Sequence, residues 1–132
     1  MTYVMCCCFR EADALKRMWE SVQTHIPGEV VLVVVDGRFS DFDAQEDFSS
    51  DGTREFAQEH GHYLPIVDYE CEKRTAGLAF IDTLANDGDF ILNMDADETL
   101  TGMFAWPDRV GRFTFTRKTR NPVPYDRCRL YR

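Results

Sequence analysis

An unbroken aliphatic run, Val30-Val31-Leu32-Val33-Val34-Val35, ends abruptly at Asp36-Gly37 and constrains the fold more than any other feature. A short apolar run without polar alternation is typical of a strand buried on both faces of a parallel sheet, and we expect one over residues 29–35. Residues 3–9 form a second short, continuous and uncharged run. The sequence therefore predicts two central strands of a buried sheet.

Helical patterns alternate with these strands. Residues 12–25 predict a helix, because apolar side chains recur there at i, i+3, i+4, i+7 spacing and Pro27-Gly28 ends the pattern. Pro65 places a third strand near a sheet edge. The further expected elements are helices over 54–60 and 75–86 and strands over 62–68, 89–94, 112–117 and 128–131, with a surface loop over 38–50. This order predicts one α/β domain over 1–132, with a Rossmann-like, mainly parallel sheet flanked by helices.

Composition and charge narrow the expected partners. The 132 residues include 15 basic and 23 acidic ones, for a net charge of −8, whereas nucleic-acid-binding domains usually have a basic excess. No apolar run approaches the ~20 residues of a membrane-spanning helix, and the N-terminus shows neither a basic leader nor a cleavage site. Five cysteines, three of them adjacent, do not resemble a secreted disulfide framework. We therefore expect a cytoplasmic protein with no nucleic-acid partner and no transmembrane segment.

Polar side chains follow three of the predicted strands at the point where each strand ends. The first strand is followed by Arg10-Glu11, the second by Asp36, and the fourth by Asp95-Ala96-Asp97-Glu98. In open parallel sheets, ligands bind outside the carboxyl ends of the strands. We therefore expect these side chains to share one rim of the sheet and to form a site there.

The acidic run 95–98 predicts a divalent cation. Its three carboxylates lie within four residues and repel one another unless a cation neutralises them. Oxygen ligands without nearby His or Cys suit Mg²⁺ or Mn²⁺ better than Zn²⁺, so Asp95 and Asp97 are the expected metal ligands. The alternative is a solvated acidic turn in which Glu98 caps a helix.

Three further positions suggest contacts with an anion or a nucleoside. Lys73-Arg74, placed before a predicted helix, can hold a diphosphate, and Arg can grip it bidentately. The alternative is a solvated helix start, although cations oppose the helix dipole at that end. Asp36 can accept hydrogen bonds from a nucleobase or ribose, or be a turn residue beside Gly37. Asp51 can be a helix cap.

The adjacent cysteines Cys6-Cys7-Cys8 are not expected to bind metal. Neighbouring residues of a strand point to opposite faces, and structural zinc sites space their cysteines more widely, so these side chains are expected in the core. The sequence contains neither a Gly-Lys-Ser/Thr phosphate loop nor Gly-x-Gly-x-x-Gly. Their absence weakens the interpretation as a nucleoside triphosphatase or a dinucleotide-binding protein.

Taken in order, four segments resemble the family 2 glycosyltransferases with a GT-A fold. They are Val33-Val34-Val35-Asp36, Ser50-Asp51-Gly52-Thr53-Arg54-Glu55, Lys73-Arg74 and Phe90-Ile91-Leu92-Asn93-Met94-Asp95-Ala96-Asp97-Glu98. The closing Arg129-Leu130-Tyr131-Arg132 is similar to a segment of the bacterial lipopolysaccharide-core subgroup. The family usually joins its second strand to Ser-x-Asp-Gly-Thr by a very short turn. By that comparison residues 37–49 are an insertion of about a dozen residues.

The resemblance implies a nucleoside-diphosphate sugar as donor and an unknown hydroxyl acceptor. Asp95 and Asp97 would bind Mn²⁺ or Mg²⁺, Asp97 the more directly, and the cation would neutralise the departing diphosphate. The implied substrate-binding residues are Arg10 and Glu11 at the rim, Asp36 and Asp51 at the base and ribose, and Lys73 and Arg74 near the diphosphate.

The resemblance also implies inversion at the anomeric carbon, with a carboxylate base that deprotonates the acceptor hydroxyl. Family members usually carry this base and the acceptor site beyond the Asp-x-Asp, where this chain continues only to Arg132. The candidate bases are Glu98, Asp108 and Asp126.

Two other functions stay open at this point. One is a non-catalytic nucleotide-sugar-binding module that needs a partner for catalysis. The other is a nucleotidyltransferase, which would be expected to show a Gly-rich basic loop where this chain has Arg10-Glu11-Ala12-Asp13. A half-exposed strand carrying Phe113 and Phe115 could pair with a second copy of the chain as a homo-oligomer.

Overall fold

The computed structural model describes residues 1–102, 112–116 and 126–131. The elements follow in the order β1 (Thr2–Cys8), α1 (Ala12–His25), β2 (Val30–Asp36), α2 (Thr53–His60), β3 (Gly61–Pro65), α3 (Glu70–Asp82), β4 (Phe90–Asn93), β5 (Arg112–Thr116) and β6 (Asp126–Tyr131). The candidate base Asp108 lies outside the described residues. Asp126 begins β6, but its side chain is likewise outside the described part of the chain.

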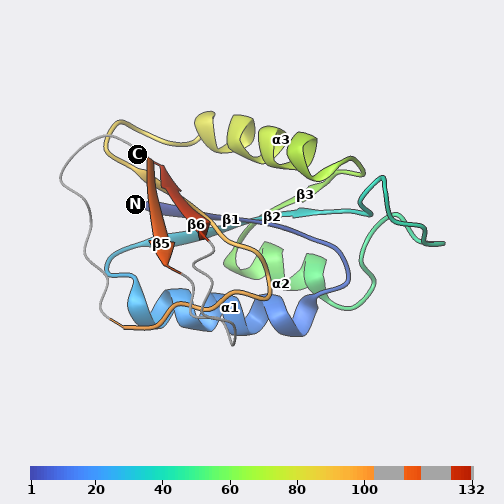
Figure 1. The fold of residues 1–132 in the computed structure, drawn as a ribbon, viewed down its shortest axis with the longest axis horizontal. Coiled ribbons are helices and arrows are strands. Elements are labelled where there is room, and N and C mark those ends of the chain that lie inside the picture. The colour runs from blue at the N-terminus through green and yellow to red at the C-terminus, as the bar shows by residue number, and fades with distance from the viewer. Residues whose placement is uncertain (103–111, 117–125, 132) are drawn as a thin grey trace.

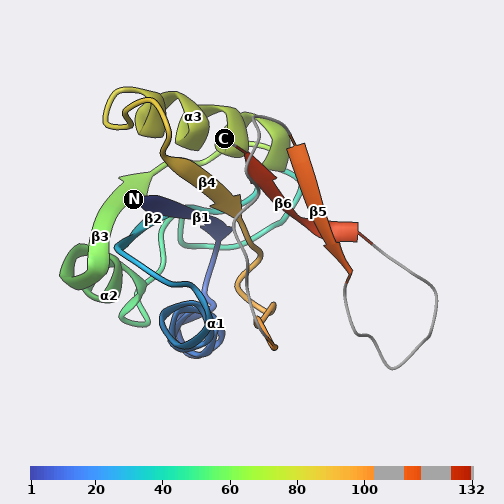
Figure 2. The same ribbon diagram turned by 90° about the vertical axis from the view of Figure 1, so that its left-hand side faces the viewer.

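The strands form one sheet in the order β3-β2-β1-β4-β6-β5. The first four of these are parallel, and β6 and β5 extend the sheet beyond β4 as an antiparallel pair. Helix α3 covers one face, while α1 and α2 cover the other (Figures 1 and 2). This arrangement confirms the α/β fold that the sequence predicts, with a mainly parallel sheet flanked by helices.

Alternate side chains of β1 fill the core on both faces of the sheet. On the face of α1 and α2, Cys6 and Cys8 pack in one cluster with Leu15 and its neighbours on the helix. On the face of α3, Met5 packs with Ile81. Burial of each such aliphatic side chain stabilises the fold by ~1.5–3 kcal/mol. Cys6 and Cys8 are therefore core residues, as the sequence predicts.

Helix α3 lies very close to the sheet because position 77 is a glycine. A Cβ atom at Gly77 would lie 2.5 Å from the sulfur of Met5 and 2.9 Å from Cγ2 of Val35. Real Cβ atoms do not approach other heavy atoms so closely, so a larger residue at position 77 would require the Met5 and Val35 side chains to shift or α3 to move away from the sheet. This close packing holds the first turn of α3 over the carboxyl ends of both strands.

The predicted bounds of α3 were wrong. The helix runs over Glu70–Asp82 rather than 75–86. It begins early because Tyr69 takes an extended conformation at the N-cap, and two glutamates in the first turn complement the helix dipole. Lys73-Arg74 therefore lies inside the helix and not before it.

The third strand is also shorter than predicted. It lies at the edge of the sheet, as Pro65 indicated, but it ends at that proline and not at residue 68. Proline has no N–H to continue the ladder. The other described elements keep close to their predicted positions. No helix among residues 1–102 is long and apolar enough to cross a bilayer.

Candidate functional site

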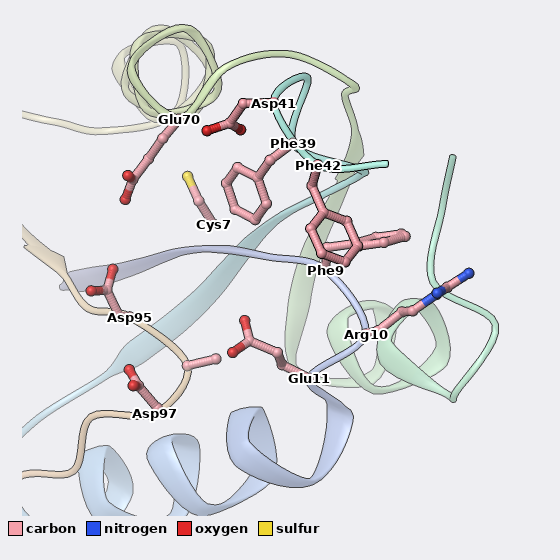
Figure 3. A pocket seen from close by; sticks show the side chains of 11 residues that line it. Cys7, Phe9, Arg10, Glu11, Phe39, Asp41, Phe42, Glu70, Asp95 and Asp97 are labelled. Atoms are coloured by element: carbon pink, nitrogen blue, oxygen red, sulfur yellow. The ribbon is translucent and has the colours of Figure 1, made fainter. Parts of the chain in front are cut away.

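The carboxyl ends of β1 and β4 open onto one cavity of about 580 Å³. These neighbouring strands are parallel, and Met5 of β1 is paired with Asn93 of β4. The segments that follow the two strands therefore emerge at the same rim of the sheet. Five carboxylates of the described residues line the cavity, and they belong to Glu11, Asp41, Glu70, Asp95 and Asp97. Phe9, Phe39 and Phe42 form an aromatic wall on the side away from Asp95 and Asp97 (Figure 3).

The acidic run folds as a tight turn beyond β4. The N–H of Asp95 donates to Oε2 of Glu98 over 2.9 Å, and the N–H of Glu98 donates to the carbonyl of Asp95 over 3.1 Å. The Asp95 carboxylate is half-buried and the Asp97 carboxylate is exposed, and both line the cavity. Burial and the charge of Glu98 raise the pKa of Asp95, although Arg74 opposes this shift. A cation would relieve the same repulsion.

Glu98 does not reach the cavity. Its side chain is buried, with 5% of its surface exposed, and one carboxylate oxygen closes the 95–98 turn. The alternative that the sequence left open is that Glu98 caps a helix. In the structure Glu98 does accept a backbone N–H, but that N–H belongs to a turn and not to a helix. The structure therefore does not place Glu98 where a base could meet an acceptor hydroxyl.

Glu11 and Arg10 leave the end of β1 in different directions. Glu11 is the N-cap residue of α1, and its carboxylate points into the cavity (Figure 3). Burial and the charge of Asp97 raise the pKa of Glu11. Arg10 adopts a positive φ of 56°, which is uncommon outside glycine, and its guanidinium forms an exposed ion pair of 3.3 Å with Glu46. Of the two, only Glu11 faces the other carboxylates.

Asp36 is buried at the end of β2, and its oxygens contact protein atoms. They accept hydrogen bonds from the Ser49 N–H at 3.0 Å, the Ser49 hydroxyl at 2.5 Å and the Tyr63 hydroxyl at 2.6 Å. Burial and the hydrogen bond to Asp36 raise the pKa of Tyr63. Asp36 does not line the cavity, so the predicted contact with a base or ribose is not available in this arrangement.

Asp51 joins the starts of two helices. Its Oδ2 accepts the N–H of Ala12, at the start of α1, over 3.1 Å. Its Oδ1 accepts the N–H and the hydroxyl of Thr53, at the start of α2, at 3.2 and 2.7 Å. The alternative of a helix cap therefore describes Asp51 better than the predicted ribose contact does.

The predicted basic pair is split between two environments. Lys73 is buried, and its ammonium donates to the carbonyls of Cys8 at 3.1 Å and Gly37 at 2.6 Å. The same ammonium lies 3.9 Å from the ring centroid of Phe39, and burial lowers the pKa of Lys73. In this structure Lys73 ties the ends of β1 and β2 together and does not face the cavity.

Arg74 points the other way, toward the acidic run. Its Nη2 lies 3.0 Å from the Asp95 carboxylate and 2.6 Å from that of Glu70. Of the two predicted diphosphate contacts, Arg74 alone lies beside the candidate metal ligands.

The sequence reasoning missed the aromatic wall and two of the carboxylates. Phe39, Asp41 and Phe42 belong to the segment that was expected to be a plain surface loop, and Glu70 belongs to a helix turn that was placed too late. One signal was present in the sequence: Phe39, Phe42 and Phe48 recur in an otherwise acidic and polar loop. Three large apolar rings in a loop indicate that the loop packs against something.

The cavity contains no preformed metal cage within the described residues. No group of three or more His, Cys, Asp or Glu side chains there is arranged to hold one ion. No protein-family model matches the chain, and no curated protein matches it significantly.

Proposed function

We propose that the chain binds a nucleoside-diphosphate sugar through Mg²⁺ or Mn²⁺ and transfers the sugar to a hydroxyl acceptor, with inversion at the anomeric carbon. The observation that carries this proposal is the placement of Asp95 and Asp97 in one cavity with Glu11, at the carboxyl ends of two parallel strands. Ligands of open parallel sheets bind at such ends. The resemblance to family 2 glycosyltransferases supports the same assignment.

The charge of the cavity explains why a cation would be required. Five carboxylates line it, and Arg10 is the only basic residue among the described side chains of its lining. A diphosphate would be repelled there unless a cation lay between the two sets of oxygens. Mg²⁺ usually takes one or two carboxylates and completes its shell with water and substrate phosphates. Asp95 and Asp97 fit that requirement in number and in donor type.

The protein's own residues would have distinct tasks in the transfer. Arg74 would hold the Asp95 carboxylate in place, as it does in the structure. The cation would stabilise the negative charge of the leaving diphosphate. The acceptor oxygen bonds to the anomeric carbon as the bond from that carbon to the phosphate oxygen breaks, and the acceptor proton passes to a carboxylate base. Because Glu98 is closed into its turn, Asp108 and Asp126 are the remaining candidate bases that the sequence predicts.

The second candidate function is a non-catalytic donor-binding module. The burial of Glu98 favours it, because the predicted base within the acidic run is closed into its turn and does not line the cavity. The free cysteines Cys6, Cys7, Cys8 and Cys71 suit a reducing compartment, so under both candidates we place the protein in the cytoplasm.

Binding and turnover measured together test both candidates. The chain is incubated with Mn²⁺ and a panel of nucleotide sugars, and both donor binding and release of nucleoside diphosphate are followed. Release in the presence of an acceptor mixture supports the transferase, and binding without release supports the module. If no donor binds in a metal-dependent way, both proposals are wrong.

A single substitution tests the metal assignment. Asp97→Asn is expected to weaken Mn²⁺-dependent donor binding at least about tenfold, since even residues that only support metal ligands contribute 10–100-fold. Asp82→Asn is the matched control, because Asp82 is an exposed aspartate at the far end of α3. An unchanged affinity in the Asp97 variant would remove Asp97 from the metal site.

A further inference from the structure

The loop between β2 and α2 (residues 37–52) is a self-supporting unit, and one end of the cavity is built from it. Arg38 closes the loop, because its N–H donates to the Asp47 carbonyl at 2.7 Å and its Nε donates to the Asp47 carboxylate at 3.2 Å. Arg38 Nη1 also donates to the Phe42 carbonyl at 3.1 Å. These bonds fix the loop before any ligand arrives, which reduces the entropy lost on binding.

The loop is also fastened to the rest of the domain. The Ser40 N–H donates to the Asp68 carbonyl at 3.1 Å, next to a bridge between Phe39 and Asp68. The Phe39 ring lies against the buried Lys73 ammonium while it also lines the cavity. The position of the Phe39 ring is therefore set by the protein.

The aromatic wall suits a flat ligand. The rings of Phe9 and Phe42 pack edge to face with centroids 6.3 Å apart. Phe42 nevertheless keeps 54% of its surface exposed at the cavity. A ring that packs on Phe9 and lies half in solvent beside a polar pocket offers a stacking face. Stacking on an aromatic ring is available to every nucleobase.

Asp41 lies between Phe39 and Phe42 in the sequence and supplies the hydrogen-bonding chemistry of this end of the cavity. It is exposed, and it forms no hydrogen bond or ion pair with the described residues, whereas Glu70 nearby is engaged by Arg74. An ionised carboxylate only accepts hydrogen bonds, and its two oxygens can accept two parallel ones. The ligand that complements Asp41 therefore presents two donors side by side.

Only one of the common nucleobases has such an edge. Guanine carries its ring N1–H and its N2 amino group next to each other. Uracil has one N–H between two carbonyl acceptors, and adenine and cytosine each place a ring-nitrogen acceptor beside their amino group. These acceptors would face the Asp41 oxygens with their lone pairs. A carboxylate at this position therefore favours guanine over the other three.

We propose that the β2–α2 loop reads the base of the donor, with Phe39 and Phe42 as the stacking face and Asp41 as a carboxylate that selects guanine. This rests on the proposed function, since it assigns the donor to the class of guanosine diphosphate sugars. It also gives a task to the segment in which the chain departs most from the glycosyltransferases that it resembles.

The test compares nucleoside diphosphates on the full chain with Mn²⁺ by isothermal titration calorimetry. Guanosine diphosphate is expected to bind more tightly than the uridine, adenosine and cytidine diphosphates. Inosine diphosphate, which has the N1–H but lacks the N2 amino group, is expected to bind several-fold more weakly than guanosine diphosphate. We expect several-fold rather than a hundredfold because Asp41 is exposed to solvent and the hydrogen bond is correspondingly weaker.

Two variants separate stacking from base selection. Asp41→Asn should abolish the preference for guanosine over inosine diphosphate and leave the affinity for adenosine diphosphate nearly unchanged. Asp43→Asn is the control, because it removes the same charge from the same loop at a side chain that does not line the cavity. Phe42→Ala should weaken all the diphosphates by a similar factor of about ten.

The outcomes distinguish this inference from the function on which it rests. Equal, metal-dependent affinities for the four common diphosphates would overturn the base assignment and leave the donor site intact. A guanine preference that survives Asp41→Asn would also overturn it. If none of the diphosphates binds in a Mn²⁺-dependent way, the donor site itself is wrong.

Discussion

Two parallel strands of this sheet lead into an aspartate, and the two carboxylates have opposite environments. Asp36 at the end of β2 is buried and accepts three hydrogen bonds from Ser49 and Tyr63. Asp95, just beyond β4, lines a cavity that other carboxylates share. The segment that follows each strand makes the difference. The long β2–α2 loop brings Ser49 back to Asp36, whereas the short 95–98 turn closes on itself and leaves its aspartates facing outward.

A position at the carboxyl end of a parallel strand is therefore not sufficient to make a carboxylate available to a ligand. At the end of β2, which we call the closed end, Asp36 accepts its hydrogen bonds from Ser49 and Tyr63 among the described residues, so the carboxylate is part of the scaffold. At the open end, beyond β4, like charges lie together, and the carboxylates of the cavity outnumber the cations that the described residues place beside them, Arg10 and Arg74. That arrangement costs stability unless a ligand cation is present, and it is therefore the better candidate for function.

The largest expected effect is at the closed end. Asp36 is buried, and Asp36→Ala leaves two half-buried donors, the Ser49 N–H and the Tyr63 hydroxyl, without their charged acceptor. We expect a loss of about 3 kcal/mol or more in the free energy of unfolding, measured by urea denaturation. Asp97→Asn at the open end should change the same quantity by less than about 0.5 kcal/mol. If the two variants were equally stable, the contrast between the ends would not exist.

The adjacent residues Lys73 and Arg74 sharpen the contrast within one helix turn. Lys73→Met removes the ammonium that satisfies the buried carbonyls of Cys8 and Gly37, and we expect a loss of about 2 kcal/mol in unfolding free energy. Arg74→Met removes partly exposed ion pairs with Glu70 and Asp95, which contribute at most about 1 kcal/mol.

The two substitutions should have the opposite ranking in donor binding, where Arg74→Met has the larger effect. Arg74→Met is expected to weaken Mn²⁺-dependent donor binding, because Arg74 holds the Asp95 carboxylate. Lys73→Met should leave that binding intact at temperatures where the variant is still folded. A larger effect on binding from Lys73 than from Arg74 would show that Lys73 leaves its buried position to meet the ligand.

The sequence alone predicted most of the fold because the fold depends on patterns within single segments. The apolar runs of β1 and β2 and the stripe of α1 each lie within a few consecutive residues. The sequence failed to predict the start of α3, because the apolar periodicity begins later than the helix does. The first turn is polar, and the residue that it buries is the charged Lys73.

The site was harder to predict because it depends on contacts between distant residues. The rim shared by Glu11, Asp95 and Asp97 follows from strand order and was anticipated. Whether Asp36 faces a ligand depends on Ser49, thirteen residues further on. No pattern within a single segment predicts that the loop brings Ser49 back to Asp36. The aromatic wall was missed for the same reason, because the β2–α2 loop has no periodicity from which to infer its packing.

A cation should act on the open end alone. Mn²⁺ at about ten times its dissociation constant is expected to stabilise the wild-type chain by about 1.4 kcal/mol, seen as a rise in Tm that EDTA reverses. Asp97→Asn should lose this rise, while Asp82→Asn should retain it. A rise of equal size in the Asp97 variant would mean that the cation binds elsewhere on this acidic chain.

The smallest expected effect concerns Asp51, a carboxylate that resembles Asp36 in being used by the protein but is exposed to solvent. Burial raises the pKa of Asp51, but hydrogen bonds from Thr53 and Ala12 outweigh this, so the pKa lies below its ordinary value of 3.8. The unfolded chain therefore binds the proton more readily than the folded chain. The stabilisation from the charge is complete above that ordinary value and is lost as the pH falls through the lower folded value.

Asp51→Asn tests this sign. At pH 7 the variant is expected to be less stable by a few tenths of a kcal/mol, since asparagine keeps one acceptor for the helix N-termini and solvent screens the lost charge. The difference from the wild type, measured by urea denaturation, should shrink as the pH falls below about 4, because the unfolded chain takes up its proton first and the folded chain follows at its lower pKa. Asp43→Asn controls for the loss of one charge. A difference that widened in acid would show that the hydrogen bonds do not favour the ionised form, and Asp51 would then belong with the open carboxylates of the cavity and not with Asp36.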